Sequence, residues 1–98
     1  MYVAVCQMTL HIGMSASLKD KRQVVRSVLQ RVRNQFELAA AEVGTQESWQ
    51  LATLGLSCVS DSAKHAQEVI ERAARYVEES RPDVDVTDVQ IEVLPVDF

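Results

Sequence analysis

Hydrophobic residues in this sequence recur with two different periods, and the order of those periods leaves few folds open. Apolar and polar side chains alternate in residues 2–12, 49–60 and 86–96, which is the pattern of a β-strand with one buried face. Two intervening segments place apolar residues three or four positions apart, as amphipathic helices do. Residues 36–43 are short and alanine-rich and suit either a strand or a helix; we predict a strand.

Helix-start signals sharpen the boundaries of both helical segments. Ser17 is a good N-cap residue, and Asp20 follows it three positions later, as in a capping box. The first helix is predicted to end near Asn34. The second should begin after Asp61 or Ser62 and end before residues 80–85. We expect these residues to be buried together: Cys6, Leu54, Leu56, Val28, Leu29, Val32, Val69, Ile70 and Val77.

The predicted order is strand, helix, strand, strand, helix, strand. Two right-handed crossovers around a hairpin give the split βαβ arrangement. We therefore predict an α+β, ferredoxin-like βαββαβ sandwich, with a four-stranded antiparallel sheet, two helices on one face and the other face open. The 98-residue chain has no linker, repeat or low-complexity run, so residues 1–98 are expected to form one domain.

Charge and cysteine content narrow the class of protein. The net charge of −4 disfavours a general polyanion binder. The N-terminal segment has no basic region or cleavage site, and polar residues interrupt it, so it reads as neither a signal peptide nor a membrane span. We expect a cytoplasmic protein with no membrane contact. In the alternation of their strands, Cys6 and Cys58 fall on the apolar side that faces the core. We therefore expect two reduced, buried and inert thiols.

The sequence contains few residue combinations typical of catalytic or metal sites. His11 and His65 have no cysteine at metal-ligand spacing, and no glycine pair has dinucleotide-motif spacing. Asp88 and Glu92 share the predicted open face, where we interpret them as charges that guard an edge strand rather than as a divalent-ion site. We predict a protein that is not an enzyme and that has no catalytic residue, metal or cofactor.

A basic segment stands out in this acidic chain. Residues 17–36 contain six bases and a single acid, Asp20, which gives this segment a local charge of +5. The segment has few acids one turn away from its bases, so it does not neutralise itself. Such a helix start suits phosphate, including the RNA backbone. Alternatives are a solvated basic face, or bases that acids elsewhere in the fold neutralise. The candidate anion or RNA site comprises Ser17, Lys19, Lys21, Arg22 and Arg26.

The open face predicts a different kind of contact. RNA-recognition modules stack bases on aromatic residues of their central strands, whereas the corresponding positions here include Val3, Val5 and Val59 and no aromatic residue. These three valines are candidate interface residues, and we expect a homodimer. Trp49 is either a further interface anchor, since tryptophan is enriched at hot spots, or a lid over the core.

Two stretches, SLKDKRQVVRSVLQRVRNQF and AAAEVGTQESWQLATLGLSCVS, resemble the YlxP-like family, which is domain-of-unknown-function family 503 of small bacterial proteins. The resemblance rests on a Ser-Leu-Lys-x-Lys-Arg helix start, an Ala-Glu-Val strand and a tryptophan after the turn. The matching residues are Ser17, Leu18, Lys19, Lys21, Arg22, Ala41, Glu42, Val43 and Trp49.

The resemblance implies a ferredoxin-like fold and supplies no catalytic residue. Family genes often lie beside those for translation initiation and ribosome-binding factor A, which implies a role in ribosome maturation or translation. We therefore predict a ribosome- or RNA-associated accessory factor that binds the phosphate backbone through its basic first helix. The alternative is a protein–protein or homo-oligomerisation module that uses the open sheet face or an edge strand. A small-ligand or enzymatic domain is a third interpretation.

Overall fold

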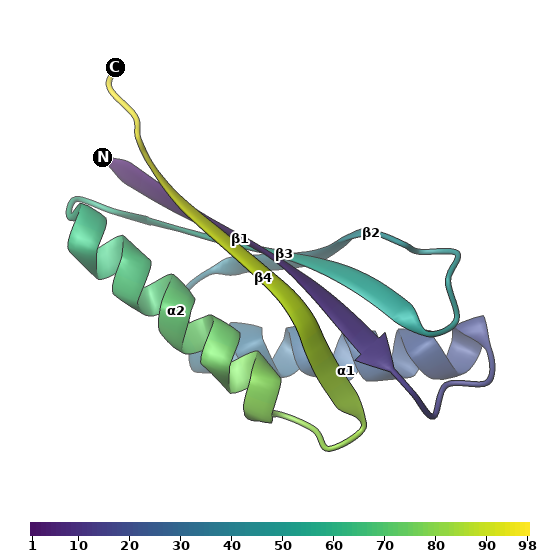
Figure 1. Cartoon of the computed structure of the whole chain (residues 1–98). Coiled ribbons are helices and arrows are strands. Elements are labelled where there is room, and N and C mark those ends of the chain that lie inside the picture. Colours follow the sequence, from purple (N-terminus) through teal and green to yellow (C-terminus); the bar gives the residue numbers. More distant parts are fainter.

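The computed structural model describes all 98 residues and contains the predicted elements in the predicted order (Figure 1). The sheet order is β2-β3-β1-β4, every neighbouring pair is antiparallel, and both helices cover the same face of the sheet (Figure 1). The ferredoxin-like prediction is therefore confirmed. The elements are β1 (Tyr2–Ile12), α1 (Leu18–Gln35), β2 (Ala39–Gly44), β3 (Leu51–Ser60), α2 (Ala63–Glu79) and β4 (Val84–Pro95).

Strand β1 is central and pairs with both β3 and β4. Its even-numbered residues from Ala4 to Ile12 are buried against the helices, while its odd-numbered residues lie on the open face. This split follows directly from the two-residue period of a strand. Eight of the nine residues predicted to be buried together are buried. The exception, Val69, is half-buried and packs against the core from its margin.

Both helices begin at serine caps. The Oγ of Ser17 accepts a 3.1 Å hydrogen bond from the backbone N–H of Asp20, and the Asp20 carboxylate accepts from the N–H of Ala16. In α2 the cap is Ser62, whose Oγ accepts from the N–H of His65 at 3.2 Å. These bonds satisfy donors that a helix start leaves free. Neither helix combines the length and the apolar run needed to cross a membrane.

The alanine-rich segment is a strand, but only from Ala39 onward. Phe36 ends α1 as its C-cap and packs edge-on against Tyr76 of α2, with ring centroids 5.7 Å apart. Ala39 to Glu42 then pair with β3 at the edge of the sheet, and the register shifts between Glu42 and Gly44. Pairing with β3 decides the strand, because six residues with this composition have no strong local preference.

The turn between α2 and β4 is held by a side-chain pair. Arg81 and Asp83 form two 2.8 Å hydrogen bonds in the fork geometry of guanidinium and carboxylate. The hydrogen bonds from Arg81 lower the pKa of Asp83 below its usual range. This pair fixes the point at which the chain turns back into the sheet.

Candidate functional site

The structure divides the bases of α1 into two groups. Lys21, Arg31 and Arg33 reach partners within the protein, whereas the side chains of Lys19, Arg22 and Arg26 are exposed and bond to no other residue. Lys19, Arg22 and Arg26 have no ion-pair partner, because the structure contains two salt bridges and neither involves them. We refer to Lys19, Arg22 and Arg26 as the basic flank.

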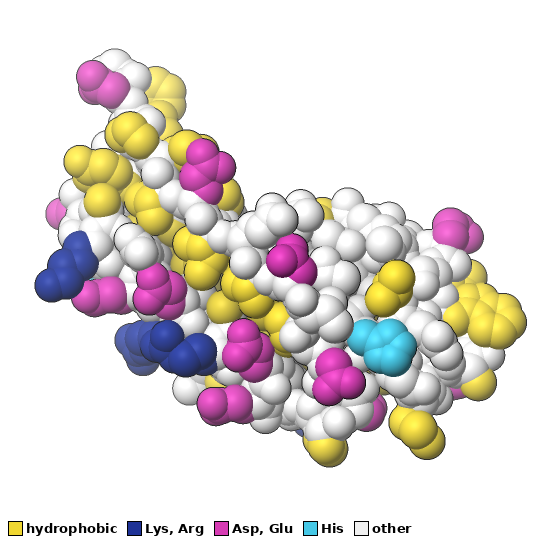
Figure 2. Space-filling view, in the orientation of Figure 1, with side chains coloured by type: hydrophobic (Ala, Val, Ile, Leu, Met, Phe, Trp, Pro, Cys, Tyr) yellow, Lys and Arg dark blue, Asp and Glu magenta, His cyan; other side chains and the backbone are white.

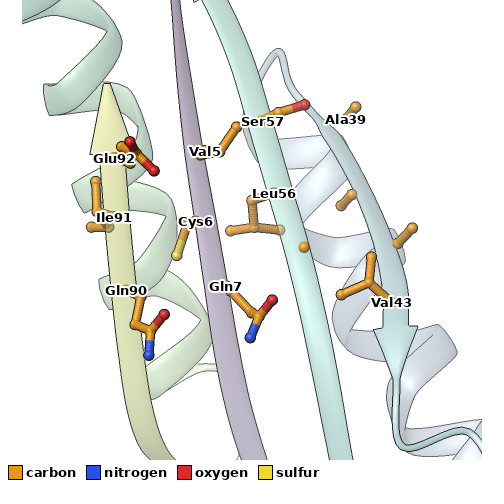
Figure 3. Close-up of a pocket in the computed structure, with 13 residues that line it drawn as sticks. Val5, Cys6, Gln7, Ala39, Val43, Leu56, Ser57, Gln90, Ile91 and Glu92 are labelled. Atoms are coloured by element: carbon orange, nitrogen blue, oxygen red, sulfur yellow. The ribbon is translucent and has the colours of Figure 1, made fainter. Parts of the chain in front are cut away.

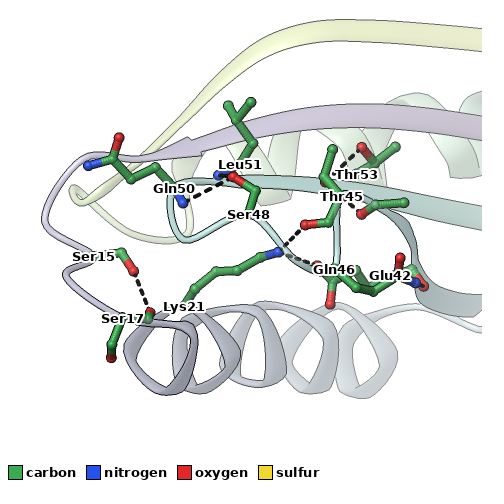
Figure 4. Close-up of polar contacts among 11 residues, drawn as sticks. Ser15, Ser17, Lys21, Glu42, Thr45, Gln46, Ser48, Gln50, Leu51 and Thr53 are labelled. Carbon is green, nitrogen blue, oxygen red and sulfur yellow. Dashed lines mark hydrogen bonds and ion pairs between the residues drawn. The ribbon is translucent and has the colours of Figure 1, made fainter.

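Lys21 is fully buried, so the prediction that it binds an external anion is wrong. Its Nζ lies 2.8 Å from Glu42 Oε2 of β2 and 2.5 Å from the carbonyl oxygen of Thr45 (Figure 4). Glu42 Oε2 is buried and receives no other donor, so Lys21 is its sole countercharge. The physical reason is helical geometry: Lys21 precedes Val25 and Val28 on the face of α1 that packs against the sheet.

Two further bases tie elements of the fold together. Arg31 donates a 2.8 Å hydrogen bond to the carbonyl of Ser80, which is the C-cap of α2. Arg33 donates through Nη2 to the carbonyl of Ala40 in the edge strand β2. Of the six bases, Lys21 alone meets an acid of the fold. Arg31 and Arg33 are exposed and donate to backbone carbonyls, which hold their side chains without neutralising their charge.

The basic flank lies on the side of α1 that faces the β2 edge. Arg33, which reaches β2, follows Arg26 by seven residues and therefore projects from nearly the same side of the helix. Lys19 and Arg22 precede Arg26 by seven and four residues, so the three side chains form a row about 10 Å long. The row runs along the outside of the molecule beside β2.

Ser17 has a structural role at the start of this row. Its Oγ accepts from the N–H of Asp20, and its carbonyl accepts from the N–H of Lys21. The Asp20 carboxylate, itself exposed, bonds to the N–H of Ala16. The helix start thus supplies its own acceptors, and the exposed cationic surface is the flank rather than the helix terminus that the sequence suggested.

The loop between β2 and β3 lies beside the first turn of α1 (Figure 4). The carbonyl of Thr45 accepts from Lys21 and also from the N–H of Ser48 at 3.0 Å. The Oγ of Ser48 accepts from the N–H groups of Gln50 and Leu51. This loop carries Trp49, which is 56% exposed. Trp49 is therefore not a lid over the core.

The open sheet face is hollowed by a groove of about 780 Å³ that crosses all four strands (Figure 3). Gln7 of β1 lies in register with Gly55 on one side and Gln90 on the other. Val43 covers Gly55 so closely that an added Cβ there would lie 2.9 Å from Val43 Cγ1. No lysine or arginine lines the groove, and its one charged lining residue is Glu92.

An apolar row crosses the same face toward the chain termini. Val3 pairs in register with Val59 of β3 and with Leu94 of β4. Val59 and Leu94 are 67% and 41% exposed, while Val3 and Val5 are half-buried by their neighbours. Figure 2 shows hydrophobic side chains gathered toward this end of the molecule. The row contains two of the predicted interface residues, Val3 and Val59, and Val5 lies on the same face two positions further along β1. Trp49 lies apart from them in the β2–β3 loop.

The sheet edges are less open than the face. At β2, the carbonyls of Ala40 and Glu42 accept from the side chains of Arg33 and Gln46. At β4, acidic residues are exposed along the strand. Both devices discourage the addition of a further strand. Of the two predicted modes of association, the geometry therefore favours contact through the open sheet face over contact through an edge strand.

The two cysteines are free and buried. Burial raises the pKa of the Cys6 thiol to about 11 and also raises that of Cys58. Cys58 Sγ contacts the carbonyl of Ala66 at 3.5 Å. Because the thiolate is the reactive form, neither cysteine is poised as a nucleophile near neutral pH. No three histidine, cysteine or acidic residues gather in an arrangement that could hold a metal ion.

These features define a ferredoxin-like α+β protein that exposes a basic helix flank and an uncovered sheet face. The chain belongs to the DUF503 family of proteins of unknown function, whose family model matches residues 3–91. It is 33% identical over 73 residues to the uncharacterized protein YlxP of Bacillus subtilis (strain 168), covering 74% of this chain and 78% of that protein. The family resemblance expected from the sequence is confirmed.

A solved structure supports the architecture. A de novo designed protein with a ferredoxin fold, LFR1 1, superposes with a TM-score of 0.59 and covers 98% of this chain and 87% of its own. Its sequence identity is 14%, so the likeness concerns the fold alone. In the present chain, the fold brings two of the resemblance motifs into contact through Lys21 and Glu42, and the third, Trp49, lies on the adjoining loop.

Proposed function

We propose that this protein is a non-catalytic, cytoplasmic accessory factor that binds RNA phosphates in a ribosomal particle through the basic flank. One observation carries the proposal: Lys19, Arg22 and Arg26 form a row of exposed, unpaired bases in a chain whose net charge is −4. The gene neighbourhood of the family directs the choice of RNA toward ribosomal particles.

The division of bases within α1 supports this function. Lys21, Arg31 and Arg33 have acceptors in the fold, and their removal would disturb the structure. The basic flank contributes no such contact, although three like charges on one side of a helix repel one another. A row about 10 Å long can meet successive phosphates along one strand, and each neutralised phosphate releases counterions.

We expect the variant Lys19→Gln, Arg22→Gln, Arg26→Gln to lose most of its affinity for RNA. Three contacts to single-stranded phosphates give a slope of roughly −2 in log affinity against log salt concentration, and the variant should approach zero slope. Fluorescence polarisation with a labelled single-stranded RNA, measured across a salt series, checks this. Thermal unfolding should hardly move, because exposed substitutions usually change stability by within about 0.5 kcal/mol.

A matched control removes the same number of charges from α2. Lys64, Arg72 and Arg75 are exposed, and changing all three to glutamine lowers the net charge equally. We expect this control to keep the salt slope of the unmodified protein. Equal losses in both variants would reduce the effect to overall charge, and unchanged binding in the basic-flank variant would refute the proposed function. A tagged pull-down from native cells should recover ribosomal particles that RNase treatment releases.

The open face favours a second candidate function, self-association. The apolar row of Val59, Val3 and Leu94 adjoins a groove that no lysine or arginine lines. The four strands have 11, 6, 10 and 12 residues. At roughly 3.3 Å per residue and roughly 4.8 Å between strands, they cover an area of about 600 Å², which approaches the ~800 Å² per partner of a standard interface. With β4 of one copy over β2 of the other, the acids of β4 would face alanines rather than one another.

Sedimentation at high micromolar concentration is expected to show twice the 10.9 kDa chain mass. Val59→Lys should shift the protein to the monomer, because it places a charge in the apolar row at its most exposed residue. Met14→Lys is the control, since Met14 is 84% exposed and lies outside the open face. A monomer in the unmodified protein at that concentration would contradict the self-association candidate.

A further inference from the structure

Trp49 lies on a loop whose shape is fixed from several directions. The carbonyl of Thr45 binds Ser48 N–H and Lys21 Nζ, and the hydroxyls of Thr45 and Thr53 lie 3.1 Å apart. Thr45 itself has a φ of 58°, in the left-handed region that a β-branched residue rarely adopts. The loop is thus held by bonds to α1 and β3, and it presents a large aromatic side chain to solvent.

The same contacts place the loop that carries Trp49 beside the first turn of α1, where the basic flank begins. Lys21 precedes Arg22 directly in α1, and its Nζ touches Thr45, four residues before Trp49. Four residues span at most about 15 Å of extended chain, and the turn from Thr45 to Ser48 shortens that path. Figure 1 shows the β2–β3 loop and the start of α1 at the same end of the molecule.

We propose that Trp49 is a stacking platform for an unpaired base of a single-stranded RNA whose phosphates lie along the basic flank. This inference rests on the proposed function and specifies its ligand as single-stranded RNA. Lys21 is a positioning residue in this site: it holds Thr45, and through the loop it holds Trp49, without meeting the RNA itself.

Physical chemistry favours a single strand over a duplex. Bases of a duplex are stacked on one another, whereas unpaired bases can stack on aromatic side chains. Proteins that bind single strands combine a cationic path for the backbone with such platforms. The open face carries no aromatic residue on its strands, so the sheet-face mode of base stacking is absent here. Trp49, on the β2–β3 loop, and the basic flank, which begins at the same end of the molecule, would supply these two parts.

The chain contains one tryptophan, so its intrinsic fluorescence reports on Trp49 alone. Titration with a single-stranded RNA oligomer should quench this fluorescence, and an RNA duplex should quench it far less. Trp49→Ala is expected to weaken binding of the oligomer roughly 5- to 150-fold, the range for loss of one stacked base, with the salt slope unchanged. Trp49→Phe should recover part of the affinity.

The control removes another exposed aromatic residue. Phe98 is fully exposed at the C-terminus, at the far end of the molecule from the β2–β3 loop (Figure 1), and Phe98→Ala should leave binding unchanged. An oligomer of equal length with abasic sites should keep the salt slope but bind the unmodified protein and Trp49→Ala alike.

The outcomes separate this inference from the proposed function. RNA binding with a normal salt slope, but without quenching and without an effect of Trp49→Ala, would overturn the stacking site and leave the basic flank as the binding surface. Absence of binding by both the RNA oligomer and inorganic polyphosphate would refute the proposed function itself. Quenching by the oligomer together with loss of affinity in Trp49→Ala, but not in Phe98→Ala, supports the stacking site.

Discussion

Replacing Lys21 with methionine is expected to lower the free energy of unfolding by about 3–5 kcal/mol, the range for breaking a buried ion pair on one side. Methionine keeps much of the apolar stem, so the loss comes chiefly from the charge. Glu42 Oε2 would remain buried with no countercharge, and the carbonyl of Thr45 would lose a donor. Urea unfolding followed by circular dichroism measures the change. Since small domains are stable by about 5–15 kcal/mol, the variant should be studied at low temperature.

Two further variants make this prediction decisive. Lys19→Met lies two residues earlier in the same helix but at an exposed position, and it should change stability by within about 0.5 kcal/mol. The double variant Lys21→Met, Glu42→Leu should recover much of the loss, because replacing both charges by apolar groups is often neutral. If Lys21→Met behaves like Lys19→Met, the buried ion pair does not stabilise the fold as described.

Shortening Ile70 to alanine should cost about 2–5 kcal/mol of unfolding free energy. Ile70 has no exposed surface and lies in α2 within the single core of twenty buried hydrophobic residues. The change removes buried methyl and methylene groups and leaves a cavity that the surrounding β-strands cannot fully close. Chemical denaturation, with the midpoint and slope both recorded, gives the magnitude.

A neighbouring exposed position provides the comparison for Ile70. Glu68→Ala alters the outer side of the same helix and should stay within about 0.5 kcal/mol of the unmodified protein. Leu29→Ala, at a position that is 8% exposed, should fall in the lower part of the range for buried leucine. A loss below about 1 kcal/mol for Ile70→Ala would mean that α2 does not pack on the sheet as the structure shows.

Periodicity predicted the fold because it is a local property that packing preserves. The alternation of β1 assigned every residue from Ala4 to Ile12 to the correct face, since a strand turns its side chains by a fixed amount. The helix cap at Ser17 was also predictable from the sequence, because its hydrogen-bond partner Asp20 lies only three residues away. In such elements the sequence neighbours are also the spatial neighbours.

The site was less predictable, because its contacts join distant segments. Lys21 and Glu42 are far apart in the sequence, so the pattern of α1 alone does not identify the acid that pairs with the buried Lys21. A helical-wheel count would have placed Lys21 beside Val25 and Val28 and hinted at its burial. The exposure of Trp49 had no comparable signal, because a loop has no period that assigns its side chains to a face.

The side chains that occupy or flank the two edge strands limit how copies of this protein can assemble. Strand addition at an edge regenerates a free edge each time and can therefore continue into fibres. Here side chains occupy the Ala40 and Glu42 carbonyls at one edge, and acids line the other. Contact through the open face ends after one pairing, because each copy has a single such face. The architecture thus restricts any association through the sheet to a finite, closed complex, even where the local concentration of the protein is high.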